Sequence, residues 1–269
     1  LPVVTACATS SHAIGEAYRA IRHGYADAIL AVGAEAGISP LIMAGFISCN
    51  ALSIQSDPAR ASLPFDRRRD GFVMGEGAGA LVLEEWDHAR ARGARIYAEM
   101  TGYGNTCDAY HMTAPLPGAE ENARAISMAM EEGGMVAYDQ IYFNAHGTGT
   151  PINDRVETLA LKRVFGQGAY HIHISSTKSM TGHMMGAAGA AEAIASVLSL
   201  YHGAMPPTVG LVEPDPECDL DYLPIQAKFA SPCRSRWGLE GTMPAWPSVR
   251  GRGEHGAAHI PQPTCMAAY

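Results

Sequence analysis

The strongest constraint on the fold is a repeated alternation between short apolar runs and longer segments whose apolar residues recur at helical spacing. Six runs are typical of buried strands, at residues 3–6, 28–33, 80–85, 96–102, 141–145 and 172–175. Five segments predict helices, at residues 11–25, 40–52, 119–132, 154–165 and 187–202. Strands that alternate with helices predict an α/β fold around a mostly parallel sheet.

Composition and charge exclude several classes of protein. With 47% hydrophobic and 17% charged residues, the chain is a globular protein rather than a disordered or fibrous one. A net charge of −8 argues against a nucleic-acid partner, because such proteins present a concentrated basic face. No apolar run is long enough to cross a bilayer, so no membrane partner is expected.

The cysteine pattern suggests neither a metal centre nor a disulfide framework. The six cysteines form no C-x-x-C pair and stand at no close Cys/His ligand spacing. His171 and His173 share one face of a strand, but the sequence offers them no third ligand nearby. We therefore expect no metal and a cytoplasmic location, where thiols stay reduced.

Both ends of the chain differ from its middle. The first residue is Leu1, and the chain opens directly into a strand-like run, which predicts a cut N-terminus. Residues 231–269 hold two of the three tryptophans, with scattered proline and arginine and no period of either 2 or 3.6. We expect this stretch to be a disordered or aberrant tail.

Cys7 is the first candidate for chemistry. The run at residues 3–6 leads into small and hydroxyl residues and then a helix, which puts Cys7 at a helix N-terminus. The helix dipole and free N–H groups there favour a thiolate, lowering a thiol pKa from about 8.5 to roughly 3.5–7.5. A thiolate attacks thioesters, although a lone cysteine among small residues is also commonly a buried packing group.

Polar side chains also follow two later strands. His146 comes after the run at 141–145, and Lys178 and His183 come after the run at 172–175. The carboxyl ends of strands are where open α/β sheets place their sites. The alternative is a structural histidine at 146, together with a solvated lysine and a capping histidine at the start of a helix.

Five motifs in order resemble the β-ketoacyl-[acyl-carrier-protein] synthase II family. They are TAC at 5–7, PFDRRRDGFVMGEGAG at 64–79, CDAYHMT at 107–113, NAHGTGTP at 144–151 and SSTKSMTGHMMGAAG at 175–189. The resemblance covers residues 1 to about 230. It implies a thiolase-like layered α/β sandwich that elongates fatty acids by decarboxylative Claisen condensation of malonyl-acyl carrier protein.

The resemblance also implies roles for four residues. Cys7 resembles the nucleophile that takes the growing acyl chain, and His146 and His183 resemble the pair that assists decarboxylation. Two imidazoles near an enolate oxygen would stabilise charge that develops only in the transition state. Lys178 would support the hydrogen-bond network around them.

Other implications concern substrates and partners. Thr148 and Thr150 resemble the hydroxyls that bind the pantetheine arm, and Phe46 resembles an acyl-pocket wall, although it could equally be core. Glu192 matches a family carboxylate, but on a continuous helix it would lie opposite His183, so we expect it to support the site residues from behind and not to meet the substrate. No cofactor is implied, since the substrates arrive on the phosphopantetheine of acyl carrier protein, and the intact family forms homodimers.

The family pattern divides the chain into three parts. Residues 1–95 would be the end of the first thiolase-like half, with the nucleophile and a connecting segment. Residues 96–230 would be the second half, and 231–269 an unmatched tail. Much of the first half and a glycine-rich loop of the family would then be missing, so we expect an incomplete sandwich and an impaired or inactive isolated chain.

Two alternative functions stay open at this point. The same ancestry could give a thiolase-type acyltransferase, although such enzymes carry a second active-site cysteine and no later cysteine here lies in a matching motif. The chain could also be a noncatalytic ketosynthase-like partner subunit. Such subunits usually lack the nucleophile, so Cys7 favours the enzyme.

Overall fold

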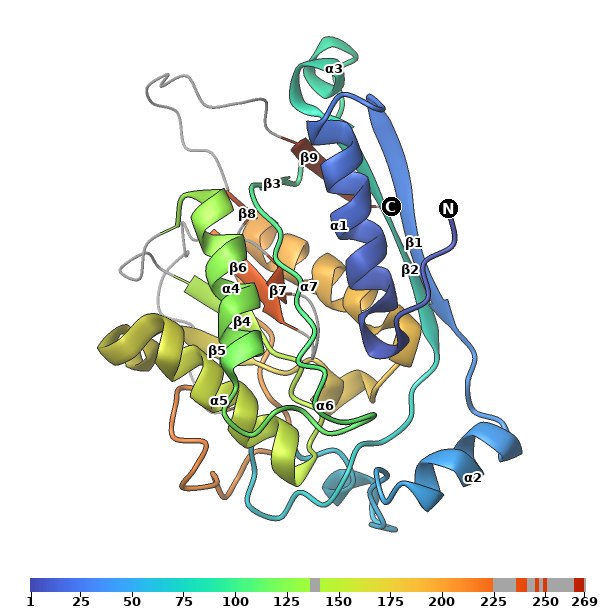
Figure 1. The fold of residues 1–269 in the computed structure, drawn as a ribbon, viewed down its shortest axis with the longest axis vertical. Coiled ribbons are helices and arrows are strands. Elements are labelled where there is room, and N and C mark those ends of the chain that lie inside the picture. Colours follow the sequence, from blue (N-terminus) through green and yellow to red (C-terminus); the bar gives the residue numbers. More distant parts are fainter. Residues whose placement is uncertain (136–140, 225–235, 241–244, 247–248, 251–263, 269) are drawn as a thin grey trace.

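The computed structural model describes residues 1–135, 141–224, 236–240, 245–246, 249–250 and 264–268, and shows two sheets with helices between and beside them (Figure 1). The helices are α1 Thr9–Arg22, α2 Pro40–Ser48, α3 Trp86–Ala91, α4 Glu120–Gly133, α5 Pro151–Phe165, α6 Lys178–Thr181 and α7 Ala188–His202, with 3-10 turns at Ala6–Ala8, Pro58–Arg60, Gly166–His171 and Met185–Ala187. The strands are β1 Ala28–Glu35, β2 Gly77–Glu85, β3 Ala98–Met100, β4 Ile141–Asn144, β5 His173–Ser175, β6 Arg236–Glu240, β7 Ala245–Trp246, β8 Val249–Arg250 and β9 Thr264–Ala268.

The α/β class is confirmed, but the expectation of one mostly parallel sheet is wrong. The first sheet has the order β1-β2-β9-β3-β8, and all of its pairs are antiparallel. The second has the order β5-β4-β6-β7, and β4 runs parallel to both of its neighbours. The reason lies between β1 and β2, where α2 stands away from the sheet instead of covering it as a crossover helix would (Figure 1).

Five of the six predicted strands and all five predicted helices exist, with boundaries moved by a few residues. Glycine ends two of the helices as the sequence indicates, since Gly134 (φ 60°) caps α4 and Gly203 (φ 67°) caps α7. The strand expected at residues 3–6 is absent from the described chain, where Leu1 to Thr5 pair with no neighbouring strand and a 3-10 turn follows.

The tail also differs from expectation. Residues 231–269 show no periodicity, yet β6 to β9 fall within them and pair with strands of both sheets. Pairing with a distant strand edge is a non-local interaction that leaves no local period in the sequence, which is why the pattern misses it. The remainder of the tail lies outside the described residues, and the division at residue 95 stays a prediction.

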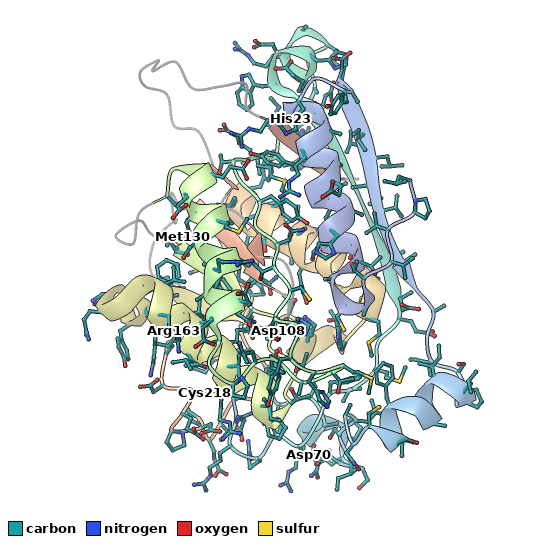
Figure 2. The ribbon with its side chains drawn as sticks, in the orientation of Figure 1. His23, Asp70, Asp108, Met130, Arg163 and Cys218 are labelled. Carbon is teal, nitrogen blue, oxygen red and sulfur yellow. The ribbon has the colours of Figure 1, made fainter. Side chains whose placement is uncertain are left out.

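Two apolar cores hold the layers together, and side chains fill the space between the sheets (Figure 2). One core joins α1 and α7 to β1, β2 and β3, and it includes Tyr142 of the second sheet. The other packs α4 and α5 against β4 and β5. Helices α1 and α7 therefore lie between the sheets, and no helix of the described residues is long and apolar enough to span a membrane.

The crossing of α1 and α7 fixes their separation. Ser10 of α1 accepts a hydrogen bond from the Ala190 N–H at 2.9 Å, which satisfies a free donor in the first turn of α7. At Gly189 an added Cβ would lie 2.0 Å from the Ser11 hydroxyl and 2.9 Å from its backbone nitrogen. Only a glycine lets the two helices approach this closely.

We expect Gly189→Ala to lower the free energy of unfolding by about 1–3 kcal/mol, because the methyl group overpacks the helix crossing. Gly45→Ala is the matched control, since a Cβ there meets nothing within 4 Å. It should leave stability unchanged or raise it by up to about 1 kcal/mol. Urea denaturation followed by far-UV circular dichroism measures both, and equal stabilities for the two variants would contradict the packing argument.

Candidate active site

Cys7 sits on a tight turn immediately before α1. Ala6 has φ 51°, in the left-handed region that costs a non-glycine residue energy. The Thr9 hydroxyl holds this turn, accepting from the Thr5 N–H at 2.9 Å and donating to the Ala6 carbonyl at 2.8 Å. His12 adds a 2.6 Å contact from Nδ1 to the Thr5 hydroxyl. The turn replaces the simple helix start that the sequence predicts, and it places the sulfur against His183.

His183 lies in the break between α6 and α7. Gly182 has φ 68° and ends α6, so the chain turns before His183. The backbone of His183 then pairs with the loop that precedes β2: its N–H donates to the Val73 carbonyl at 2.7 Å, and its carbonyl accepts from the Gly75 N–H at 2.9 Å. A segment more than 100 residues away in sequence thus fixes this imidazole.

His146 follows β4, and α5 holds its backbone. Glu157 of α5 accepts from the His146 N–H at 2.5 Å and from the Gly147 N–H at 2.8 Å, one bond to each carboxylate oxygen. Burial raises the pKa of Glu157, and the bond from Gly147 is the largest effect opposing that rise. The carboxylate thereby anchors the residues that lead from the strand into the site loop.

These elements bring Cys7, His146 and His183 together. The Cys7 sulfur lies 2.9 Å from Nε2 of His183. The two imidazole rings meet edge to face, with centroids 5.2 Å apart and an interplanar angle of 88°. The three side chains therefore gather in one place, although Cys7 reaches it from a 3-10 turn and not from the end of a strand.

Lys178 and Glu192 form a buried ion pair beside the two histidines. Lys178 Nζ contacts Glu192 Oε1, and the side chains are 2% and 6% exposed. Glu192 would lie opposite His183 only on one continuous helix. The chain instead breaks at Gly182 and passes through the 3-10 turn Met185–Ala187 before α7 begins, so Glu192 reaches the site through Lys178.

Burial sets the protonation of the histidines. It lowers the pKa of His183 well below the usual value, and the Lys178 ammonium adds to the effect. Burial also lowers the pKa of His146 well below the usual value, and Lys178 and then His183 add to that effect. Both imidazoles are therefore neutral at pH 7, each with one N–H to donate and one nitrogen to accept.

The expectation of a depressed thiol pKa is wrong. Burial raises the pKa of Cys7 to about 11, although Lys178 acts to lower it. The thiol is therefore neutral in the resting site, and its 2.9 Å contact with His183 makes that imidazole the acceptor for the proton. This arrangement supports attack with general-base assistance rather than a standing thiolate.

The remaining predicted residues lie nearby. The hydroxyls of Thr148 and Thr150 are 2.9 Å apart on the loop between His146 and α5. Phe46 of α2 meets Phe72 edge to face, with ring centroids 5.3 Å apart, and Phe72 meets His183 in the same manner at 5.3 Å. Phe46 belongs to neither apolar core, so the alternative that it is plain core does not hold.

Sequence analysis misses Glu157 and Phe72. An acidic residue early in the helix that follows a candidate loop is a usable signal for Glu157, since carboxylates there can accept free backbone N–H groups. Phe72 lies in the motif at 64–79, but nothing local in that motif indicates contact with a histidine 111 residues later.

The same three side chains are the only group of possible metal ligands that converges in the described part of the chain. Their ligand atoms lie within 4.8 Å of one another, and thiolate with two imidazoles is a set that Zn²⁺ accepts. A metal-bound imidazole normally donates its other N–H to an acceptor. His183 Nδ1 is buried without a hydrogen-bond partner, so the set fits acyl chemistry better than a resident metal.

Comparison with known proteins gives consistent matches. The beta-ketoacyl synthase N-terminal domain matches residues 1–89, and the beta-ketoacyl synthase C-terminal domain matches residues 97–212. The 3-oxoacyl-[acyl-carrier-protein] synthase 2 of Synechocystis sp. is 54% identical over 84% of this chain and 54% of its own length. That of Staphylococcus aureus is 52% identical over 84% of this chain and 56% of its own.

A solved structure shows the same fold. It contains a type II polyketide synthase acyl-carrier protein in complex with its ketosynthase bound to the hexaketide. The match has 39% identity and a TM-score of 0.88, and it covers 92% of this chain and 62% of that one. The chain spans about half the length of the curated relatives it matches.

We expect iodoacetamide labelling of Cys7 to accelerate about tenfold per pH unit from pH 7 to 10 without a plateau, because the thiolate reacts and the thiol pKa is about 11. Lys178→Met should slow labelling at a given pH, since the ammonium lowers that pKa. Peptide mapping measures the rate, and the exposed Cys49 and Cys107 serve as internal references. A plateau at or below pH 8 would show a standing thiolate instead.

Proposed function

Because this chain belongs to the β-ketoacyl synthase family, we propose that it carries the reaction centre of a decarboxylative Claisen condensation that elongates fatty acids. The substrate would be malonyl-acyl carrier protein, and the acyl chain would be held on Cys7. The single observation that carries the proposal is the Cys7 sulfur at 2.9 Å from His183 Nε2, with the His146 ring against His183.

The first step would load the acyl chain. The Cys7 sulfur attacks the thioester carbonyl while its proton moves to Nε2 of His183. Collapse of the tetrahedral intermediate breaks the bond to the pantetheine sulfur, which leaves as a thiolate and takes the proton back. The low pKa of His183 favours this return, because a buried imidazolium beside Lys178 is unstable.

The second step would form the carbon–carbon bond. The malonyl thioester loses CO₂, and the electron pair of the broken bond becomes an enolate. Neutral His146 can donate an N–H to the enolate oxygen, and His183 can do so in the tautomer that carries its proton on Nε2. The ammonium of Lys178 favours the new negative charge. The carbanion attacks the acyl carbonyl on Cys7 and expels the Cys7 thiolate, which takes a proton from solvent.

The carrier protein would present both substrates on its phosphopantetheine arm. The paired hydroxyls of Thr148 and Thr150 lie beside His146 and can hydrogen-bond the amides of that arm. Phe46 would form a wall of the acyl pocket, reaching the site through Phe72. The four cysteines in the described part of the chain are free, which supports a reducing, cytoplasmic location.

The loading step tests the proposal directly. Incubation with an acyl-carrier protein should transfer the acyl group to Cys7, seen by mass spectrometry as one added acyl mass on the peptide that contains this residue. Cys7→Ser should abolish a hydroxylamine-labile adduct, because an ester of serine resists mild hydroxylamine. Acylation of Cys49 or Cys107 at the rate of Cys7 would contradict the proposed site.

We expect His146→Ala to lower the rate of CO₂ release from malonyl-acyl carrier protein by about 10²–10³-fold, the typical cost of losing one oxyanion donor. Acylation of Cys7 should change little, since the proton acceptor in that step is His183. Labelled bicarbonate release and single-turnover acylation measure the two steps separately. An equal loss in both would assign His146 to a different role.

We also propose that the protein forms a homodimer through β1 and α2. Strand β1 lies at the edge of its sheet, with Leu30 61% and Val32 50% exposed. Helix α2 has no buried residue, and its Leu41 is 82% and Ile47 60% exposed. An apolar strand edge continuous with apolar surface is a typical site of self-association.

Val32→Lys should weaken this association, because it places a charge on the exposed face of the edge strand. Sedimentation velocity measures the change, and the expected result is a shift from dimer to monomer at micromolar concentration. Val212→Lys is the control, since Val212 is 73% exposed on a loop outside the two elements. A wild-type chain that sediments as a monomer at all concentrations would overturn the dimer.

A further inference from the structure

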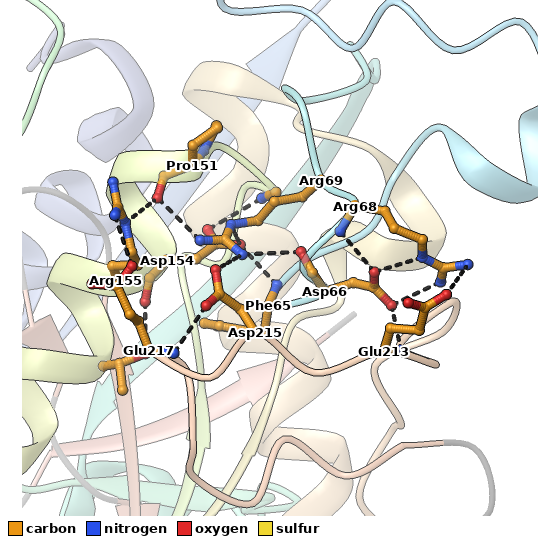
Figure 3. Close-up of polar contacts among 12 residues, drawn as sticks. Phe65, Asp66, Arg68, Arg69, Pro151, Asp154, Arg155, Glu213, Asp215 and Glu217 are labelled. Carbon is orange, nitrogen blue, oxygen red and sulfur yellow. Dashed lines mark hydrogen bonds and ion pairs between the residues drawn. The ribbon is translucent and has the colours of Figure 1, made fainter.

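Arg69 is a buried cation that the proposed reaction does not use. It lies in the loop between the turn Pro58–Arg60 and β2, and its side chain is 3% exposed. Figure 3 shows its guanidinium pointing between the start of α5 and the segment that carries Asp215. It donates to the carbonyls of Asp66 at 2.9 Å, Pro151 at 3.1 Å and Thr150 at 3.3 Å, and it pairs with the carboxylates of Asp215 at 2.6 Å and Asp154 at 3.5 Å.

Asp154 connects this cation to the loop of the site. One of its oxygens accepts from the Phe65 N–H at 2.8 Å, and the other accepts from the Gly149 N–H at 3.2 Å. Gly149 has φ 78°, and a Cβ there would approach the Gly71 carbonyl oxygen to 3.3 Å. The peptide around Gly149 is therefore held in one conformation by the carboxylate and by the loop that carries Arg69.

The guanidinium opposes protonation of this carboxyl group. Burial raises the pKa of Asp154, and Arg69 provides the largest opposing effect. A protonated Asp154 would be a weaker acceptor for the N–H groups of Phe65 and Gly149. Removal of Arg69 would also leave any charge on Asp154 buried without its partner. Such a charge destabilises a protein far more than an exposed ion pair stabilises it.

Resting on the proposed pantetheine site, we propose that Arg69 is a positioning residue that sets affinity for the pantetheine arm. The hydroxyls of Thr148 and Thr150 flank Gly149, whose N–H is held by Asp154, and the Thr150 carbonyl is held by Arg69. The backbone that carries the two hydroxyls is thus held by one network, made by Asp154 and Arg69. Cys7 and His183 are held by other contacts, so the network acts on binding and not on the nucleophile.

Alkylation of Cys7 tests this without turnover. The probe is an aminopantetheine that carries a chloroacetamide group, and free chloroacetamide is the reference reagent. Saturation kinetics with the probe give KI, which reports binding of the arm, and kinact, which reports reaction at the sulfur. Arg69→Met should raise KI about tenfold, as expected for the loss of roughly one hydrogen bond to the arm. Both kinact and the rate with free chloroacetamide should stay within about twofold.

Two further variants separate positioning from general destabilisation. Arg69→Lys keeps the charge but not the planar fork, so KI should rise by an intermediate factor; this variant carries the test if Arg69→Met does not fold. Arg155→Met is the matched control, because Arg155 donates to the same Pro151 carbonyl at 2.9 Å from a side chain that is 42% exposed (Figure 3). Its KI should equal that of the wild type.

The outcomes distinguish this inference from the proposed function. A wild-type chain whose Cys7 reacts no faster with the tethered probe than with free chloroacetamide would overturn the pantetheine site and this inference together. A wild type that saturates, with KI unchanged in both Arg69 variants, would overturn the inference alone. The inference would also be overturned if Arg69→Met slowed the reaction with free chloroacetamide as much as the reaction with the tethered probe, since that pattern marks a general loss of structure.

Discussion

The buried pair of Lys178 and Glu192 is the interaction on which the chemistry of the site depends. Two opposite charges with 2% and 6% exposed side chains persist in an apolar interior because each is the partner of the other. The pair places a fixed ammonium behind two imidazoles that burial has already made neutral. The site thus holds a positive charge in place before any negative charge develops, which is the arrangement that favours an enolate.

Two buried acidic side chains hold the backbone of the site. Glu157 accepts the N–H groups of His146 and Gly147, and Asp154 accepts that of Gly149. Both acidic residues lie on α5, within two turns of its start, so one helix holds three backbone N–H groups of the loop before it. The loop then needs few side-chain contacts of its own, and its threonine hydroxyls stay available for a ligand.

The sequence predicts which residues gather, but not their pKa values or the contacts that support them. His146 and His183 follow strands that the sequence predicts, so their approach is readable from strand and helix order. The strand predicted before Cys7 is absent, and a 3-10 turn places that residue instead. The raised pKa of Cys7 is not readable, because burial of its sulfur depends on how distant segments pack around it. The pairing of Glu192 with Lys178 is not readable either, since the break at Gly182 is a backbone feature without a periodic signal. The strands β6 to β9 depend on distant edges and leave no local pattern.

A neutral thiol beside a neutral imidazole has a consequence for selectivity. A standing thiolate reacts with any electrophile that reaches it, whereas a thiol with a raised pKa gains nucleophilicity only as its proton moves toward His183. That transfer is favourable only while negative charge develops on a carbonyl oxygen within reach of the donors of the site. Desolvation therefore protects the resting nucleophile by keeping its thiol protonated. The same loss of water strengthens the electrostatic field of Lys178 once a thioester fills the site. Burial, which makes the free thiol a poor nucleophile, is thus also what would make the substrate complex reactive.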